Sequence, residues 1–436
     1  MSDALSLPPR PNLDQYKKLA KDFQDACQTG EVSAVLDWAK RWLETLASLQ
    51  RRGAEPHELR ADLHRIERRF RKMKKLGEDV TRCTLADAQF FLAQCHGFDS
   101  WAKFARHMQA LARGDSAASL FERAADAIVA GELGTLDGLL RAHPELATER
   151  SEREHGSTLL HYVSANGVED FRQKSPPNIV AIARRLLDAG ADVNAESNAY
   201  GGRSAVLGLT ATSWPPQEAG VQIELMGLLI ERGAAIDGPA GGAVTACLHN
   251  GRKEAAEYLA RRGAKLDLEG AAGVGDVEAV RGFFEADGWL KAGTTKQQMT
   301  DGFVWACEFG RDEVVACLLD LGMPIGERGA SKATGLHWAA HEGNASTVEL
   351  LLKRGADVSA RDGEFEGTAL DWGVYGWGNA SGEKRARRQY YDAVAALARK
   401  GARMTEGWYQ DDEERLRAKG RVESDARMQA ALRGES

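Results

Sequence analysis

Cysteines are few in this sequence, and none of the six belongs to a CxxC pair. Their wide spacing argues against zinc ribbons and disulfide frameworks, so we expect free, mostly buried thiols. Long apolar stretches are also missing, because no run approaches the roughly 18 residues of a membrane helix. The N-terminus has neither the charged start nor the apolar core of a secretory signal. We therefore expect a cytoplasmic protein without a membrane segment.

The chain also lacks the excess of basic residues that is typical of nucleic-acid-binding proteins. Its 57 lysines and arginines are outnumbered by 64 aspartates and glutamates, so a nucleic-acid role would need a local basic patch. Catalytic motifs are absent as well: the sequence contains no GxSxG, P-loop, dinucleotide-binding glycine fingerprint or HExxH. The sequence therefore predicts no motif-marked enzyme, no cofactor and no metal.

One stretch, Thr334 to Asp362, contains the start, the corner and the end of a helical hairpin. Thr334 can cap the first helix, Gly343 turns the chain, and Gly355 can close the second helix in the left-handed conformation. Apolar residues recur at helical spacing on both helices, and neither helix can bury its apolar face alone. The hairpin therefore needs copies of itself on both sides, as in a helical solenoid.

The segments TGLHWAA, EGN and VELLLKRGADVSA of this hairpin resemble the ankyrin repeat, whose pattern is TPLHxAA, xxG and VVxLLLxxGADVNA. Similar segments recur at 157–196, 223–237 and 303–323. The resemblance implies an all-α fold, with a solenoid of about eight degenerate repeats joined by short hairpin connections. It also implies that His337 is a structural hydrogen-bonding residue that links adjacent repeats. The expected core positions of the eight repeats are Leu139, Leu186, Leu229, Leu259, Phe283, Leu318, Leu351 and Leu397. The short separation of Leu259 and Phe283 leaves no room for a full hairpin, so we expect an irregular joint there.

Three regions are expected along the chain. Residues 1–112 are predicted to form a separate N-terminal helical module, and they resemble the short module that precedes the repeats in a group of bacterial ankyrin-repeat proteins. Residues 120–405 hold the repeats, and residues 406–436 form a polar helical cap or tail. In the module, Phe98, Trp101 and Phe104 are expected to be core aromatics.

A basic stripe is predicted on one helix of the N-terminal module. Apolar residues at steps of three and four give this helix a side that faces the core. The other faces carry Arg65, Arg68, Arg69, Arg71, Lys72, Lys74 and Lys75. Such a stripe can contact phosphates, but a solvated helix face is the more common explanation.

Large aromatic residues recur where an ankyrin-type array has its groove. Trp305, Trp338 and Trp372 occupy one equivalent position in successive repeats, which predicts an aromatic ladder with steps of about 10 Å. Packing between repeats is the alternative role for these rings. Insertions between the two helices of a repeat add further aromatic candidates. The predicted partner-binding residues are Trp305, Glu308, Phe309, Trp338, His341, Glu342, Trp372, Tyr375, Trp377, Trp214, His249 and Asn250.

We interpret the chain as a protein–protein interaction scaffold whose partner is unknown. A basic rim in the insertion 376–389 favours an acidic partner segment. This rim consists of Lys384, Arg385, Arg387 and Arg388. Two alternatives stay open: nucleic-acid binding through the basic helix, and an enzyme or small-molecule site in the groove. The residues around which such a groove site would form are His249, Glu308, His341 and Tyr375. His337 and His341 lie one helical turn apart, but two ligands alone do not make a metal site.

Overall fold

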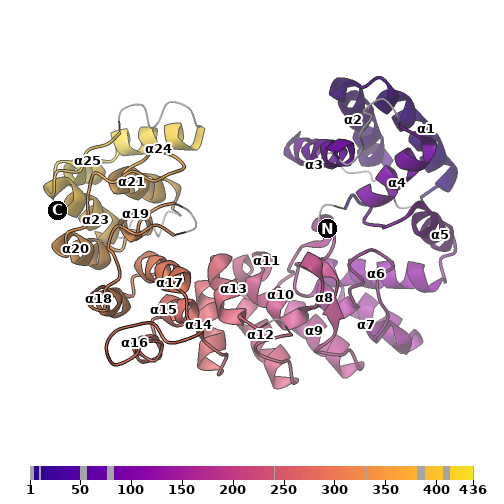
Figure 1. The fold of residues 1–436 in the computed structure, drawn as a ribbon. Coiled ribbons are helices and arrows are strands. Elements are labelled where there is room, and N and C mark those ends of the chain that lie inside the picture. Colours follow the sequence, from indigo (N-terminus) through magenta and orange to yellow (C-terminus); the bar gives the residue numbers. More distant parts are fainter. Residues whose placement is uncertain are drawn as a thin grey trace. The chain divides into compact units, whose positions relative to one another are not determined.

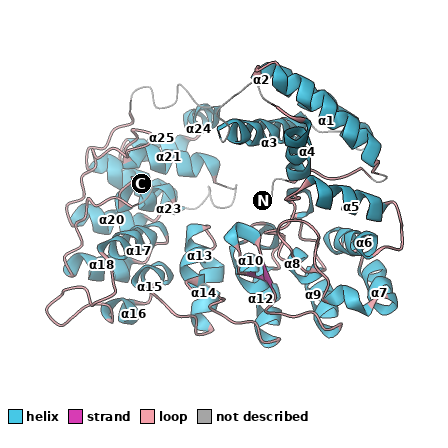
Figure 2. Ribbon diagram, turned by 45° about the vertical axis from the view of Figure 1, so that its right-hand side comes forward, coloured by secondary structure: helices cyan, strands magenta, loops and turns pink. Residues whose placement is uncertain are grey.

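The computed structural model describes residues 4–8, 11–49, 56–75, 83–239, 241–329, 332–380, 388–405 and 413–435. Helices make up nearly all of the regular structure in these ranges (Figure 1, Figure 2), which confirms the predicted all-α fold. Strands β1 (Glu196–Ser197) and β2 (Ser204–Ala205) form a short antiparallel pair. The chain divides into two compact units, unit 1 (Met1–Ala240) and unit 2 (Gly241–Ser436).

Five helices open unit 1, and their apolar sides meet in one core. They are α1 (Leu13–Gln28), α2 (Val32–Leu49), α3 (Pro56–Lys75), α4 (Leu85–Cys95) and α5 (Trp101–Leu111). Phe23 and Phe91 stack in this core with ring centroids 4.4 Å apart. Phe98 and Phe104 are fully buried there, as predicted, whereas Trp101 packs at the edge and stays half-buried.

Eight helix pairs follow these helices in the described part of the chain, which confirms the predicted number of repeats. In unit 1 the pairs are α6 (Ala117–Ala130) with α7 (Leu133–Ala142), α8 (Leu159–Tyr162) with α9 (Ile179–Asp188), and α10 (Val206–Thr212) with α12 (Gln222–Glu231). In unit 2 they are α13 (Ala243–His249) with α14 (Lys253–Arg261), α15 (Leu268–Val274) with α16 (Val277–Arg281), α17 (Lys296–Glu308) with α18 (Asp312–Asp320), α19 (Gly335–His341) with α20 (Ala345–Lys353), and α21 (Ala369–Asn379) with α23 (Arg388–Arg399). Short helical turns lie between them: η1 (Pro144–Ala147), η2 (Asp170–Arg172), η3 (Ala199–Gly201) and α11 (Pro215–Glu218).

The second helix of most pairs ends at a glycine in the left-handed conformation. The φ angles at these glycines lie between 89° and 97°, a region that side chains with a Cβ rarely adopt. They are Gly190, Gly233, Gly263, Gly322, Gly355 and Gly401. Four residues before each of them lies a buried leucine, so the predicted core positions are confirmed in these repeats.

The fifth pair departs from the prediction in its core position. Phe283 is only partly buried, and Val280 of α16 takes the core position instead. The reason is that α16 ends at Gly282 in the right-handed conformation, with φ of −60°, so the register of the other repeats does not apply. The 24-residue separation leaves room only for a shortened hairpin, as expected, because α15 and α16 have seven and five residues and still pair.

Two helices follow the last pair, α24 (Glu413–Ser424) and α25 (Ala426–Leu432). Val422 and Met428 are buried in the same core as α21 and α23. A Cβ atom added to Gly378 of α21 would lie 2.7 Å from the Cβ of Ala418, so the backbone of α24 runs close against α21. Both helices therefore pack against the last repeat.

All six cysteines are buried and free, as expected from their spacing. Among the described residues, no helix is both long enough and apolar enough to cross a membrane.

Candidate functional site

A first aromatic cluster in unit 2 comprises His249, Lys253, Glu269, Trp305 and Phe309. The Trp305 indole N–H donates to Glu269 Oε1 at 2.8 Å, and His249 Nε2 lies 2.5 Å from the same oxygen. The Trp305 and Phe309 rings stack with centroids 5.8 Å apart. Lys253 Nζ lies 5.9 Å from the centroid of the Phe309 ring. The buried Glu269 carboxylate thus orients an indole and an imidazole, while the two stacked rings remain half-exposed.

The first aromatic cluster follows from the helical register of α17 and its close packing on α15. Trp305 and Phe309 are four residues apart, so their side chains lie on the same helix face. A Cβ atom added to Gly302 would lie 2.9 Å from the Cβ of Ala272. This glycine lets α17 approach α15 so closely that the Trp305 indole reaches Glu269.

A second aromatic cluster comprises Trp338, His341, Trp372 and Tyr375. The Trp338 and Trp372 rings meet edge to face with centroids 5.1 Å apart. The His341 ring lies 5.9 Å from Trp372 and 6.1 Å from Tyr375. The Trp372 indole N–H donates to Asp362 Oδ2 at 3.0 Å. Although burial acts in the opposite direction, the hydrogen bonds that this carboxylate accepts lower the pKa of Asp362, so it remains an anion that fixes the Trp372 ring.

The predicted aromatic ladder is wrong in its spacing. Trp338 and Trp372 approach much more closely than the expected helix-packing distance, because the edge of one ring is turned toward the face of the other. Trp305 belongs to the first aromatic cluster, where His249 and Phe309 are its ring partners. The three tryptophans therefore contribute to two clusters.

His337 has the structural role that the ankyrin resemblance implies. Its Nδ1 lies 2.8 Å from the Thr334 hydroxyl, and its Nε2 lies 3.2 Å from the Gly367 carbonyl oxygen of the following repeat. Burial lowers the pKa of His337, which favours the neutral ring that these contacts need. Both ring nitrogens are occupied within the repeats, so His337 does not form a metal pair with His341.

Two of the predicted partner-binding tryptophans are buried. Trp377 is 1% exposed and packs against Tyr391 with ring centroids 6.2 Å apart. Its prediction as a partner contact is wrong. Trp377 belongs to α21 and not to the loop that follows this helix, and its side chain is buried in the core. Trp372 is 8% exposed, so packing is its main role and only its edge faces outward.

The remaining predicted residues keep part of their surface exposed. Glu308 ends α17 and Glu342 follows α19, and both are half-buried. His249 and Asn250 are exposed at the end of α13, where Asn250 donates to the Ala246 carbonyl at 2.8 Å. Trp214 is 55% exposed at the start of α11 in unit 1. Trp214 therefore belongs to a different compact unit from the two aromatic clusters.

Sequence reasoning missed Glu269, Phe365 and Trp289. Glu269 is the one charged residue in Leu268–Val274. A single carboxylate among small and apolar residues is the sequence feature from which it could have been identified. Phe365 is 47% exposed, with the Arg415 guanidinium 5.3 Å from its ring centroid. Trp289 is 73% exposed on the turn between Phe284 and Leu290, and an aromatic in an Asp-Gly turn was its signal.

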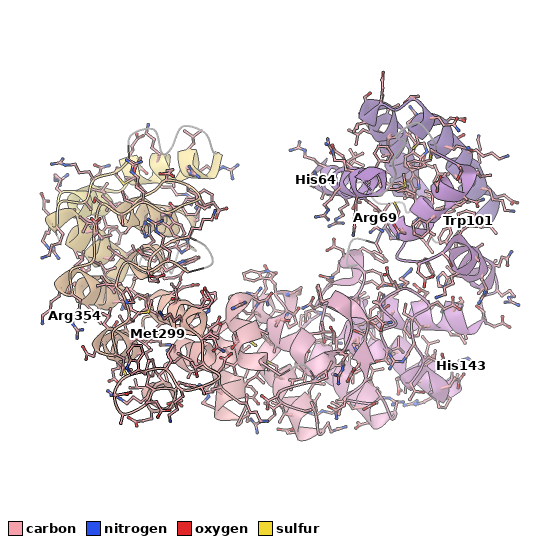
Figure 3. The ribbon with its side chains drawn as sticks, in the orientation of Figure 1. His64, Arg69, Trp101, His143, Met299 and Arg354 are labelled. Carbon is pink, nitrogen blue, oxygen red and sulfur yellow. The ribbon has the colours of Figure 1, made fainter. Side chains whose placement is uncertain are left out.

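The basic helix of the N-terminal module is α3, and the protein itself uses several of its cations. Arg69 donates to the Gln94 carbonyl of α4 at 2.5 Å (Figure 3). Arg65 pairs with Asp170, and Arg71 donates to Glu67 at 2.6 Å. These contacts favour a structural role for the stripe. The side chains of Lys74, Lys75, Lys384, Arg385, Arg387 and Arg388 lie outside the described residues.

A buried ion network in unit 1 joins the N-terminal helices to the first repeats. It comprises Glu122, Arg153, Glu169 and Arg172. Arg172 Nη1 lies 2.7 Å from Glu122 Oε2, Arg153 Nη2 lies 3.0 Å from the same oxygen, and both arginines pair with Glu169. Although burial acts in the opposite direction, the two arginines hold the pKa of Glu169 well below its usual range. The main-chain N–H of Glu154 donates to the Gly97 carbonyl at 2.8 Å beside it.

The buried ion network also borders a pocket of about 550 Å³. Arg153 and Arg172 line this pocket, but their guanidinium groups already donate to carboxylates. A bound anion would have to displace these partners, so the network is a structural clamp and a poor anion site.

Comparison with known proteins supports the repeat pattern. Residues 268–362 match the family model "Ankyrin repeats (3 copies)". Inversin from Gallus gallus is 45% identical over 60 residues, which are 13% of this chain and 5% of Inversin. The E3 ubiquitin-protein ligase hecd-1 from Caenorhabditis elegans is 42% identical over 67 residues, which are 15% of this chain and 2% of that protein. The chain thus spans only a small part of these curated relatives.

A solved structure, the human ASB11 ankyrin repeat domain, is 20% identical to this chain with a TM-score of 0.33. The match covers 63% of this chain and 96% of that domain. The family model and the sequence pattern agree over residues 268–362, so this part of the chain is similar to ankyrin repeats.

Proposed function

We propose that this protein is a non-catalytic scaffold that binds a partner protein through the two aromatic clusters of unit 2. Ankyrin repeats generally mediate protein–protein interactions. The observation that supports this proposal is the half-exposed state of Trp305, Phe309, Trp338 and Tyr375 on successive repeats. Aromatic anchors of this kind supply most of the binding energy in typical interfaces.

The hydrogen bonds within the clusters favour binding because they fix the rings before a partner arrives. Glu269 holds Trp305, and Asp362 holds Trp372. A side chain that is already ordered loses little conformational freedom on binding, which saves about 0.5–1.5 kcal/mol for each such residue. The clusters are therefore suited to act as rigid anchors.

The two alternative functions receive less support. His249 and Glu308 lie at the ends of α13 and α17, whereas His341 and Tyr375 belong to the second aromatic cluster. The residues proposed for an enzyme site are thus divided between two places. The cations of α3 that would contact nucleic acid are partly used in contacts within the protein. We propose neither an enzymatic activity nor a cofactor.

The three regions of the chain and its bacterial source, which we expected from the sequence, are also proposals. Residues 1–112 are proposed as the N-terminal helical module, 120–405 as the repeat array and 406–436 as the C-terminal cap. The resemblance of residues 1–112 to a module of bacterial proteins supports a bacterial source, and the cytoplasmic location expected from the sequence is likewise a proposal. The acidic partner segment favoured by the sequence depends on the insertion 376–389, whose basic side chains lie outside the described residues.

Affinity capture with the whole chain as bait tests the proposed function. We expect a Phe309→Ala, Tyr375→Ala double variant to lose about 2 kcal/mol or more of partner affinity. Its melting temperature should stay close to that of the wild type, because both residues are half-exposed. Trp289→Ala is the matched control, since it removes an exposed aromatic outside both clusters. If Trp289→Ala abolished capture and the double variant retained it, the binding surface would lie on the Phe284–Leu290 turn.

A further inference from the structure

We propose that the N-terminal helices of unit 1 bind a small, neutral aromatic molecule that carries a hydrogen-bond acceptor such as a carbonyl oxygen. The site is a pocket of about 340 Å³ that is lined by α1, α2 and Pro8, and we call it the α1–α2 pocket. Pockets that hold small molecules have volumes of about 300–1,000 Å³, so this pocket fits a ligand at the small end of that range. It lies outside the two aromatic clusters of unit 2, so the inference does not depend on the proposed function.

The wall of the α1–α2 pocket is aromatic and apolar. It consists of Tyr16 and Leu19 from α1 and of Trp38, Trp42, Leu46 and Leu49 from α2. Trp38 and Trp42 are one helical turn apart, so both indoles lie on the same side of α2, and their ring centroids are 5.1 Å apart. Two indoles that are held by one helix offer a flat aromatic ligand a large contact area.

Two polar atoms of this wall are buried without a hydrogen-bond partner in the part of the chain that the structure describes. They are the Tyr16 hydroxyl oxygen and the Trp38 indole nitrogen, and the two residues are 4% and 3% exposed. An unpaired buried polar group is destabilising, and native proteins contain few of them. An indole N–H can only donate, and a phenol hydroxyl can also donate. An acceptor atom of a ligand would therefore satisfy either group.

A ligand has to enter between partly exposed side chains to reach these donors. Neither polar atom is exposed to solvent, so side chains of the wall must shift as the ligand binds. Leu19 is half-buried and Leu49 is 46% exposed. Both leucines can therefore move without opening the core of the N-terminal helices.

The charges of the α1–α2 pocket favour a neutral ligand. Among the described residues that line it, only Asp22 and Arg41 are charged, and both are exposed and opposite in sign. The attraction of an ionic ligand to one of them is therefore offset by repulsion from the other. Burial raises the pKa of the Tyr16 hydroxyl, so this group stays protonated and remains a donor. An ionic group beside it would lose its hydration without a compensating charge.

Three planar probes of similar shape test this inference, namely acetophenone, α-methylstyrene and benzoate. Acetophenone carries the acceptor, α-methylstyrene has C=CH2 in place of C=O, and benzoate adds a negative charge. The readout is the set of indole N–H signals of the full chain, labelled with ¹⁵N-tryptophan, in ¹H–¹⁵N NMR spectra. Trp38→Phe identifies the Trp38 signal by its loss. We expect acetophenone to shift this signal saturably and to bind about fivefold more tightly than each of the other two probes.

The matched control is Trp42→Phe, which removes the same atoms from the other buried tryptophan of the pocket. Trp38→Phe should abolish the preference for acetophenone over α-methylstyrene, because an aromatic ring remains and the N–H is lost. Trp42→Phe should keep this preference, since the Trp38 N–H is unchanged. An equal loss of preference in both variants would overturn the inference, because any change in the wall would then have the same effect.

The wild type alone also decides the question, should either variant fail to fold. Equal affinities for acetophenone and α-methylstyrene would show that no donor of the protein contacts the ligand. Tighter binding of benzoate than of acetophenone would show that the site selects an anion. Either result would overturn the inference, and so would the absence of a saturable shift with acetophenone or a shift confined to other tryptophan signals.

Discussion

Replacement of Gly376 by alanine tests the close packing of the last two repeats. A Cβ atom at Gly376 of α21 would lie 1.9 Å from the carbonyl oxygen of His341 and 2.8 Å from its carbonyl carbon. The obstacle is main chain and not the end of a flexible side chain, so α19 or α21 has to move by about 1.5 Å to restore ordinary contact. Overpacking of this kind costs about 3 kcal/mol. Alanine also favours the helix by about 1 kcal/mol over glycine, so we expect a net loss of about 2 kcal/mol.

Urea denaturation followed by circular dichroism measures this loss, and the matched control is Gly420→Ala in α24. Gly420 is exposed, and an added Cβ would have no atom within 4 Å. We therefore expect Gly420→Ala to keep or raise the free energy of unfolding, by up to about 1 kcal/mol. A Gly376→Ala variant as stable as the wild type would refute the close approach of α21 to His341.

Three further predictions concern single buried side chains. Leu351→Ala should lower the free energy of unfolding by about 2–5 kcal/mol in urea denaturation, because Leu351 is fully buried. Glu169→Gln should cost about 3 kcal/mol in the same assay, because it removes the charge that compensates Arg153 and Arg172. Burial lowers the pKa of His161 from 6.5 to about 4, so the unfolded chain binds a proton in this range that the folded chain does not. His161 should therefore lower the free energy of unfolding by up to about 1.4 kcal/mol per pH unit as the pH drops from 6.5 toward 4. Burial also lowers the pKa of His96 to about 3, so His96 adds a slope of the same sign, and His161→Asn should reduce the dependence without abolishing it.

Each of these predictions has a control or an outcome that contradicts it. Leu416→Ala removes a half-exposed leucine of α24 and should change stability by less than about 0.5 kcal/mol; an equal effect of Leu351→Ala would contradict the repeat register. Glu149 is exposed, and Glu149→Gln should be neutral. A loss as large as that of Glu169→Gln would show that charge reduction alone is responsible. If His161→Asn and the wild type lost stability in parallel between pH 6.5 and 4, another group would titrate there.

The repeats were predictable from the sequence because their signals are local. Gly355 lies four residues after Leu351, and the same leucine–glycine pair closes six of the eight second helices in the described part of the chain. The position of Phe283 was not predictable in this way. Its helix ends without such a glycine, so the register has no fixed reference, and packing selects Val280 instead.

The sequence predicted residues of the candidate site only where the position of a residue in the repeat determines whether its side chain is exposed. Phe309 stands directly before the corner glycine Gly310, and both Phe309 and the predicted Tyr375 are half-buried. Trp377 lies two residues after Tyr375, on the opposite side of α21, and is buried. Glu269 depends on a contact over 36 residues of sequence. A contact between residues so far apart in the sequence has no periodic pattern from which it could be predicted. It becomes visible only in the packing of α15 on α17.

The buried ion network also determines the order in which unit 1 can be completed during protein synthesis. Glu122 leaves the ribosome about 50 residues before Arg172, which corresponds to several seconds at a translation rate of about 5–20 residues per second. During this interval Arg172, one of the two arginines that pair with Glu122, is not yet available. The side chain therefore remains hydrated, because an unpaired carboxylate is costly to bury. We therefore expect the burial of Glu122 to be completed only after Arg172 has been synthesised.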